Sequence, residues 1–293
     1  MAEKDLIEKR LEDYNDVFAD IYNTLVFEEH YLREEKLNAG PTTSIYKNER
    51  GETTEQFRDV LKQYGNSCLS LMSLGIENQT KVDKAMPIRV MGYDYGNYRG
   101  MINNGKEVTP VTTIVLNFGD KQWNEAKSLH EMMRLPEKMK KYVEDYKIRV
   151  YDIAFLSDNI IEQFTSDFKL VARFFKDRRL GVDTLRTNQA ARVRHIEAVL
   201  DFLSVFTKDE RYRNSYTERV KEMEENGEEI DMCWIIQGWI NEGIEEGKIE
   251  GKIEGKIELL TKFVRNGMLS VSEAAKEVGM DMAAFESEME KCR

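Results

Sequence analysis

FRDVLKQYGNSCLSLMSLGIENQ, residues 57–79, is the stretch that decides the fold of this chain. It holds two strand candidates, FRDVLKQY and LSLMSLGIEN, joined through Gly65-Asn66, a dipeptide suited to a hairpin turn. The second candidate is largely apolar and ends in Glu77, Asn78 and Gln79. Side chains two residues apart in a strand share a face, so Glu77 and Gln79 point the same way. We therefore predict two adjacent strands whose ends carry polar groups.

The flanking segments predict an α/β fold with a mixed central sheet flanked by helices and a helical C-terminal extension. VTPVTTIVLNFG, residues 108–119, is the clearest strand, and its continuous apolarity suits a strand covered on both faces. Four further elements are predicted: an amphipathic helix over 4–27, a loop or short hairpin over 38–54, a helix from Ile88 to about Tyr98 that begins with Pro87, and a strand over 147–156. From about Ser166 onward the pattern is helical.

Composition limits the classes of function. The chain has 293 residues, a net charge of -11 and a pI of about 5.1, which counts against a broad nucleic-acid surface but allows one local basic groove. Its three cysteines are isolated, which is typical of reduced thiols rather than a disulfide framework. The N-terminus lacks an apolar signal core, and no apolar run approaches the roughly 20 residues that span a bilayer. We expect a cytoplasmic protein without membrane segments.

Basic residues concentrate between positions 169 and 194. Eight lysines and arginines, Arg178 and Arg179 among them, face two acids, Asp177 and Asp183. This is the best local phosphate-binding segment of the chain. The alternative is a solvated helical face that bridges to the acidic tail. Loss of DNA binding on replacing Arg178 and Arg179 would favour the first interpretation.

The C-terminal third contains GIEEGKIEGKIEGKIELL, a four-residue repeat that places glycine, lysine, isoleucine and glutamate in four separate stripes of a helix. Each glycine costs a helix about 1 kcal/mol relative to alanine, so the helix alone is marginal. A parallel pair would bring the lysine flank of one copy against the glutamate flank of the other. We predict a homo-oligomer formed through residues 243–258; a spacer helix is the alternative.

The last segment, residues 269–289, predicts two short helices. Ser270 and Glu273 form a capping box, Gly279 ends the first helix, and Asp281 caps the second. The second helix is acidic and would repel phosphate, which favours a small packing module over a DNA-reading helix-turn-helix.

Asp59, Glu77 and Gln79 form the constellation that could carry chemistry. Asp59 lies on the first strand candidate, so the hairpin can bring it beside the other two. Carboxylate and carbonyl oxygens are the ligands that Mg²⁺ prefers, with waters and a substrate phosphate completing its shell. The alternative for Asp59 is a polar residue on an exposed strand face.

The order of these blocks resembles a known family. Asp59 followed by Glu77-x-Gln79 resembles the PD-(D/E)xK nuclease core, with glutamine at the usual lysine position. RDVLK, GIENQT, the DKAMPIRVMGYD run, VTTIVLNFG, LHEM and YKIRVYDIAFL together resemble the Rpn-like recombination-promoting nuclease/putative transposase family, over roughly residues 10–180. The resemblance implies a restriction-endonuclease-like core and Mg²⁺- or Mn²⁺-dependent hydrolysis of DNA phosphodiesters.

The resemblance also implies roles for individual residues. Asp59 and Glu77 would be metal ligands, with the backbone carbonyl of Asn78 as a further ligand. Gln79 could orient water by hydrogen bonding but supplies no positive charge.

Four other residues are candidates around this set. Lys81 could replace that charge if the strand continues to it, and Arg89 could hold a phosphate or form a salt bridge at the core edge. Asp20 is preferred to Asp16 as the acid from the N-terminal helix that completes the site; both could equally be solvated helix acids.

We predict a metal-dependent DNA endonuclease; the alternative is a catalytically silent protein of the same fold that serves as a binding or assembly scaffold through its C-terminal helix. The expected organisation is a nuclease-like core over 1–165, a helical subdomain with the basic segment over 166–232, and a helical tail over 233–293.

Overall fold

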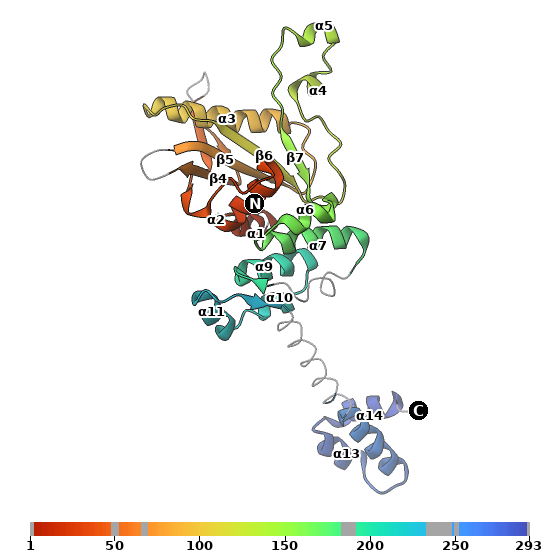
Figure 1. Ribbon diagram of the computed structural model, residues 1–293. Coiled ribbons are helices and arrows are strands. Elements are labelled where there is room, and N and C mark those ends of the chain that lie inside the picture. The colour runs from red at the N-terminus through yellow and green to blue at the C-terminus, as the bar shows by residue number, and fades with distance from the viewer. Residues whose placement is uncertain are drawn as a thin grey trace. The chain divides into compact units, whose positions relative to one another are not determined.

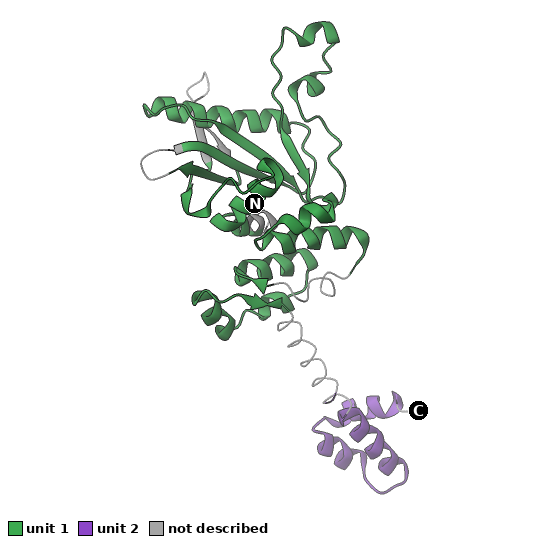
Figure 2. Ribbon diagram, viewed as in Figure 1, with its two compact units in different colours: residues 1–232 green, residues 233–293 purple. Residues whose placement is uncertain are grey.

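The computed structural model describes residues 3–47, 53–65, 70–182, 192–232, 248 and 252–291. The chain divides into two compact units, residues 1–232 and 233–293 (Figure 2). The three cysteines and residues 243–247 and 249–251 of the repeat lie outside the described residues, so the predictions for them rest on sequence alone.

A mixed sheet forms the centre of the first unit (Figure 1). Within the described residues it has five strands in the order β1-β4-β5-β6-β7. The strands are β1 (Leu37–Ala39), β4 (Val60–Gly65), β5 (Ser70–Gln79), β6 (Val111–Asn117) and β7 (Arg149–Asp152). β1, β4 and β5 are antiparallel neighbours, whereas β5, β6 and β7 are parallel. The predicted α/β fold with a mixed sheet is therefore confirmed.

Two of the interior strands, β5 and β6, account for the apolar runs of the sequence. Leu74 and Ile76 of β5, and Ile114, Val115 and Leu116 of β6, are completely buried. Helix α3 (Met86–Asn103) covers one face of the sheet, and α1 (Glu3–Glu12) and α2 (Asn15–Tyr22) lie on the other (Figure 1). Burial on both faces removes any reason for alternation between apolar and polar residues.

The single helix predicted over residues 4–27 is interrupted. α1 ends at Glu12, Tyr14 has an extended backbone, α2 follows, and η1 (Asn23–Phe27) is a π-helix. The Lys62 amine donates to the backbone carbonyl of Asp13 at 2.6 Å and to its carboxylate at 2.5 Å. A buried lysine thus replaces a helical hydrogen bond, which apolar periodicity does not reveal.

The remaining elements of the first unit are short strands and helices. The predicted hairpin over 38–54 is present as β2 (Thr43–Lys47) and β3 (Thr53–Phe57). The other elements are η2 (Glu34–Lys36), α4 (Leu129–Met133), α5 (Glu137–Lys140), η3 (Ile153–Phe155), α6 (Asp158–Gln163), α7 (Phe168–Leu180), β8 (Arg192–Val193), α9 (Ile196–Thr207), α10 (Arg211–Asn214), α11 (Glu218–Glu225) and β9 (Ile230–Asp231). The β8-β9 pair interrupts the purely helical region predicted after Ser166.

The second unit has a small core of its own. A helix over 252–265 packs with α13 (Val271–Val278) and α14 (Met282–Lys291) around Ile257, Leu260 and Phe285. The Ser270–Glu273 capping box is present, Gly279 ends α13 with φ 81°, and Asp281 accepts a hydrogen bond from the Ala284 amide at 2.8 Å. The predicted caps are confirmed. In the described part of the chain, no helix is both long enough and apolar enough to cross a membrane.

Candidate functional site

The end of β5 brings the predicted acids together. Val60 pairs with Ile76 in the antiparallel β4-β5 register, so Asp59 lies one step further along, opposite Glu77. The Asp59 carboxylate accepts the backbone N–H of Asn78 at 2.7 Å. The Asp59 charge lies close enough to affect Glu77, although Lys9 reaches Asp59 from α1 and Arg89 reaches Glu77 from α3.

The two oxygens of Glu77 have different surroundings. Oε1 forms an ion pair with Arg89 Nη2 and has Gln79 Nε2 at 3.3 Å and the Tyr93 hydroxyl at 3.4 Å. Oε2 is buried and has no hydrogen-bond partner among the described residues. Arg89 is itself fixed by Asp83, which accepts from Nη1 at 2.9 Å, and by the Tyr93 hydroxyl at 3.0 Å. One oxygen of Glu77 is thus held in place while the other remains available.

Electrostatics at Glu77 oppose its charged form. Burial raises the pKa of Glu77 to about 8, the neighbouring Asp59 charge acts in the same direction, and Arg89 and Arg58 act against both. Burial also raises the pKa of Tyr93 to about 12, so its hydroxyl remains a donor at neutral pH. A divalent cation beside the two carboxyl groups would favour the charged form of Glu77, because it stabilises both carboxylates at once.

Helix α1 contributes two groups that sequence reasoning did not assign. Lys9 Nζ lies 2.7 Å from Asp59 Oδ1, and the buried Glu12 accepts from the Asn78 side-chain amide at 2.7 Å. Asn78 Oδ1 is buried without a hydrogen-bond partner among the described residues. The sequence could have indicated these two residues, because Lys9 and Glu12 are three positions apart and lie beside the apolar Leu11. This spacing places them near the helix face that packs on the sheet.

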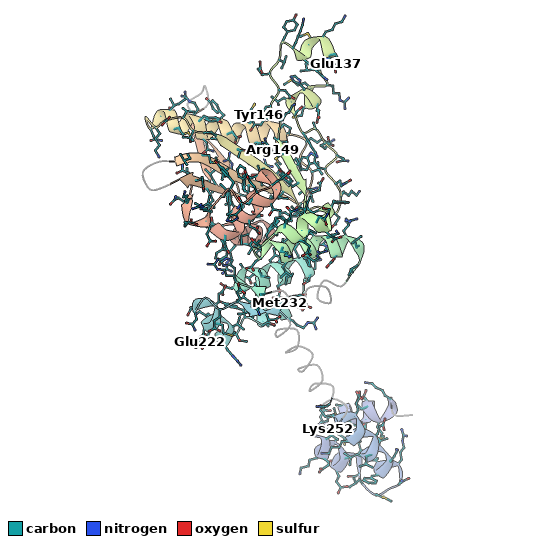
Figure 3. The ribbon with its side chains drawn as sticks, in the orientation of Figure 1. Glu137, Tyr146, Arg149, Glu222, Met232 and Lys252 are labelled. Carbon is teal, nitrogen blue, oxygen red and sulfur yellow. The ribbon has the colours of Figure 1, made fainter. Side chains whose placement is uncertain are left out.

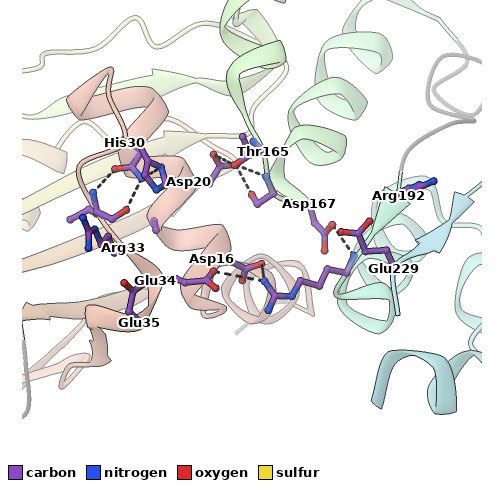
Figure 4. A pocket seen from close by; sticks show the side chains of 15 residues that line it. Asp16, Asp20, His30, Arg33, Glu34, Glu35, Thr165, Asp167, Arg192 and Glu229 are labelled. Carbon is purple, nitrogen blue, oxygen red and sulfur yellow. Dashed lines mark hydrogen bonds and ion pairs between the residues drawn. The ribbon is translucent and has the colours of Figure 1, made fainter. Parts of the chain in front are cut away.

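Asp20, the acid preferred from the N-terminal helix, is not brought together with Asp59 and Glu77. Its carboxylate accepts four hydrogen bonds from the amides and hydroxyls of Thr165 and Ser166, at 2.6–3.0 Å. It lines a separate cavity of about 550 Å³ (Figure 4). Asp16 lies in the same cavity and contacts His195 at 2.9 Å. The reason for the difference is structural: Asp20 holds the start of the α7 region against α2.

The predicted DNA contacts have mixed surroundings. β5 ends at Gln79, so the exposed Lys81 does not lie on the strand. The prediction that Lys81 supplies the charge missing at Gln79 required the strand to reach it, and the strand does not. Arg179 donates to the Ala154 carbonyl at 2.8 Å, and Arg178 lies 3.8 Å from Asp120. Both arginines are exposed.

Other members of the basic segment are paired with acids: Lys169 with Glu162, Arg173 and Lys176 with Asp158, and Arg194 with Asp16.

A buried polar network supports the site from the α3 side. Arg58 donates to Asp94 at 2.9 Å, and Asp94 also accepts from Thr113 at 2.6 Å and from Tyr146 at 2.5 Å. Arg58 lies so close to β5 that a β-carbon at Gly75 would be 2.6 Å from its Cδ. The glycine therefore makes room for a buried arginine two residues before Glu77.

The donor set fits a hard divalent cation of the Mg²⁺ type. Across the residues that the structure describes, no three His, Cys, Asp or Glu side chains form a ready metal-binding group. Mg²⁺ is commonly held by one or two carboxylates, with water and substrate phosphate as the other ligands. Asp59 and Glu77 can provide the two carboxylates. The buried, unpartnered Glu77 Oε2 is the observation that favours the fit.

Residues 57–198 match the family model described as putative transposase, YhgA-like. This segment is similar to the YhgA-like putative transposases. The resemblance to Rpn-like putative transposases is thereby confirmed. No curated protein and no solved structure matches the chain. The YhgA-like segment includes Asp59, Glu77 and Arg89, whereas Lys9 and Glu12 precede it.

Proposed function

We propose that the chain is a metal-dependent endonuclease that hydrolyses DNA phosphodiester bonds. The family match supports a transposase- or nuclease-like role and interaction with DNA. The single observation that carries the finer proposal is the pair of acids at the end of β5, one of which presents a buried oxygen without a partner. A buried carboxylate oxygen without a hydrogen bond costs free energy, so its retention suits a ligand.

Asp59, Glu77 and the backbone carbonyl of Asn78 would hold Mg²⁺ or Mn²⁺. When bound, such an ion lowers the pKa of a water molecule and neutralises charge on the attacked phosphate. The water adds to phosphorus, one P–O ester bond breaks, and the products are a phosphate monoester and a hydroxyl end.

Arg89 would orient Glu77 by holding Oε1, which leaves Oε2 for the ion. The Gln79 amide lies 3.3 Å from Glu77 Oε1, so it assists in the same positioning. Arg89 and Lys9 bring the positive charge that Gln79 lacks. Lys9 contacts Asp59 on the α1 side and Arg89 contacts Glu77 on the α3 side, so each acid has its own cation.

The test is incubation of plasmid DNA with Mg²⁺ or Mn²⁺ and the full chain. Glu77→Gln keeps the shape of the side chain and removes its charge, and Glu107→Gln, at an exposed acid, is the matched control. We expect nicking by the wild type and the control and at least a 100-fold loss in Glu77→Gln. Equal cleavage by all three would refute the proposal.

A second function, DNA binding without cleavage, is favoured by Gln79, because a neutral amide replaces the usual lysine. This function predicts that the wild type binds DNA and leaves the plasmid intact with either ion.

A further inference from the structure

Residues 119–148 form an arm that leaves the sheet between β6 and β7. Figure 1 shows its two short helices, α4 and α5, beyond the body of the first unit, and Figure 3 places Glu137 at its far end. β5 and β6 are parallel, with Gln79 opposite Asn117. The arm therefore begins at the same end of the sheet as Glu77.

The base of the arm is fixed to the core. Trp123 belongs to a buried cluster that includes Met86, Val90, Val115 and Ile148. The Asp152 carboxylate accepts hydrogen bonds from the Trp123 amide at 2.8 Å and from the Asn117 side chain at 2.6 Å. The two chain segments of the arm thus leave the body at a defined place.

The middle of the arm is braced by hydrogen bonds between its two segments. Ser128 forms a β-bridge with Lys147, and the Ile148 amide donates to the Lys127 carbonyl at 2.9 Å. The His130 amide donates to Asp145 at 3.0 Å, and a ring nitrogen of His130 lies 2.7 Å from the Val143 carbonyl oxygen. These contacts hold the two segments together.

The tip, residues 133–142 (MRLPEKMKKY), is exposed except for the half-buried Leu135. It carries four basic side chains and one acid, Glu137, which pairs with Lys140. Large apolar side chains are also exposed there: Met133 by 52%, Met139 by 46% and Tyr142 by 71%. An exposed aromatic among cations contrasts with the acidic balance of the whole chain.

We propose that this tip binds an unpaired strand of DNA that extends from the candidate site. Among the described residues, Arg134, Lys138 and Lys141 have no ion-pair partner. Lys141 Nζ lies 4.7 Å from the centre of the Tyr142 ring. An aromatic face beside free cations suits base stacking with phosphates on either side. The inference rests on the proposed function, since it assumes that DNA is the substrate.

The experiment compares two variants of the full chain in Ca²⁺, with a fluorescent single strand and a duplex of equal length as probes. The first variant replaces Arg134, Lys138 and Lys141 with glutamine. Its control replaces the exposed Lys36, Lys106 and Lys208 with glutamine as well, which removes the same charge outside the tip. For the single strand, the slope of log affinity against log salt should fall by about 2 in the first variant and by less than about 0.5 in the control.

Tyr142→Ala separates stacking from charge. We expect about 5- to 150-fold weaker binding of the single strand, which corresponds to the loss of one stacked base, and little change for the duplex.

Unchanged binding of both probes by the triple variant and by Tyr142→Ala would overturn the inference while leaving the endonuclease proposal intact. Failure of the wild type to bind either probe would contradict the endonuclease proposal itself. If the variants instead lose a self-association seen by light scattering, with DNA binding unchanged, the tip is a protein interface and the inference is wrong.

Discussion

Replacement of Arg89 by glutamine tests whether this residue positions Glu77 or merely neutralises it. Arg89 uses one terminal nitrogen for Glu77 and the other for Asp83, so it links β5 to the start of α3. Without it, the remaining donors to Glu77 Oε1 are Gln79 at 3.3 Å and Tyr93 at 3.4 Å. Both distances exceed the usual range for strong hydrogen bonds, so the carboxylate loses its one firm support.

The size of the effect follows from these contacts. Removal of a group that orients a metal ligand typically weakens metal binding about 10- to 100-fold, and we expect Arg89→Gln to fall within this range. Breaking a buried ion pair costs about 3–5 kcal/mol of unfolding free energy. The Arg89 side chain is 37% exposed, and solvent screening reduces the expected loss of stability to about 1–2 kcal/mol.

Titration calorimetry with Mn²⁺, on protein freed of metal, measures the affinity directly, and urea denaturation measures the stability. Arg99→Gln is the matched control, because Arg99 is an exposed arginine of the same helix. Arg89→Lys should recover only part of the affinity, since an ammonium group cannot reproduce the planar fork that reaches two carboxylates. Equal or tighter Mn²⁺ binding by Arg89→Gln would refute the positioning role and indicate that Arg89 competes with the ion.

Three further outcomes are expected. Gly75→Ala should lower the unfolding free energy by about 1–3 kcal/mol in urea, because the new methyl group would overlap Arg58; an unchanged midpoint would show that the arginine can move. Gly100→Ala has open space and lies within α3, so it should raise stability by about 1 kcal/mol in the same assay.

Burial alone would raise the pKa of Asp16, but the His195 hydrogen bond and the charges of His195 and Arg194 outweigh it and lower that pKa. The contribution of Asp16 to stability is therefore complete above about pH 4 and is lost as the pH falls through its lowered pKa. Asp16→Asn should be less stable than the wild type at pH 6, with the difference narrowing towards pH 3.5; a gap independent of pH would contradict this reasoning.

The sheet was predictable from sequence because its strands are buried on both faces. The apolar runs of β5 and β6 have no other explanation in a chain this charged, and the polar end of β5 marks where burial stops. The break after Glu12 was not predictable, since its cause is Lys62, which is distant in sequence and contacts the Asp13 carbonyl. Helical periodicity continues across the break and gives no sign of it.

The candidate site was predictable only in its strand residues. Asp59 and Glu77 are 18 positions apart but are linked by a hairpin, so local pairing rules place them opposite each other. Glu12 reaches Asn78 from 66 positions away, and the choice between Glu12 and Asp20 depends on how α1 and α2 pack on the sheet. Acids on both sides of the break are buried, so burial alone does not distinguish them.

The position of cations explains how a glutamine can stand at residue 79. A site that brings two acids together must balance their charge, and a lysine two residues after Glu77 would do so from the same strand. Here Lys9 reaches Asp59 from α1, and Arg89 reaches Glu77 from α3. A third cation at position 79 would compete with Arg89 for Glu77 Oε1, the oxygen that the Gln79 amide already approaches. A neutral donor there adds to the hold on Glu77 without adding positive charge, so under the proposed metal-binding role the loss of Arg89 should weaken metal binding more than the loss of Gln79.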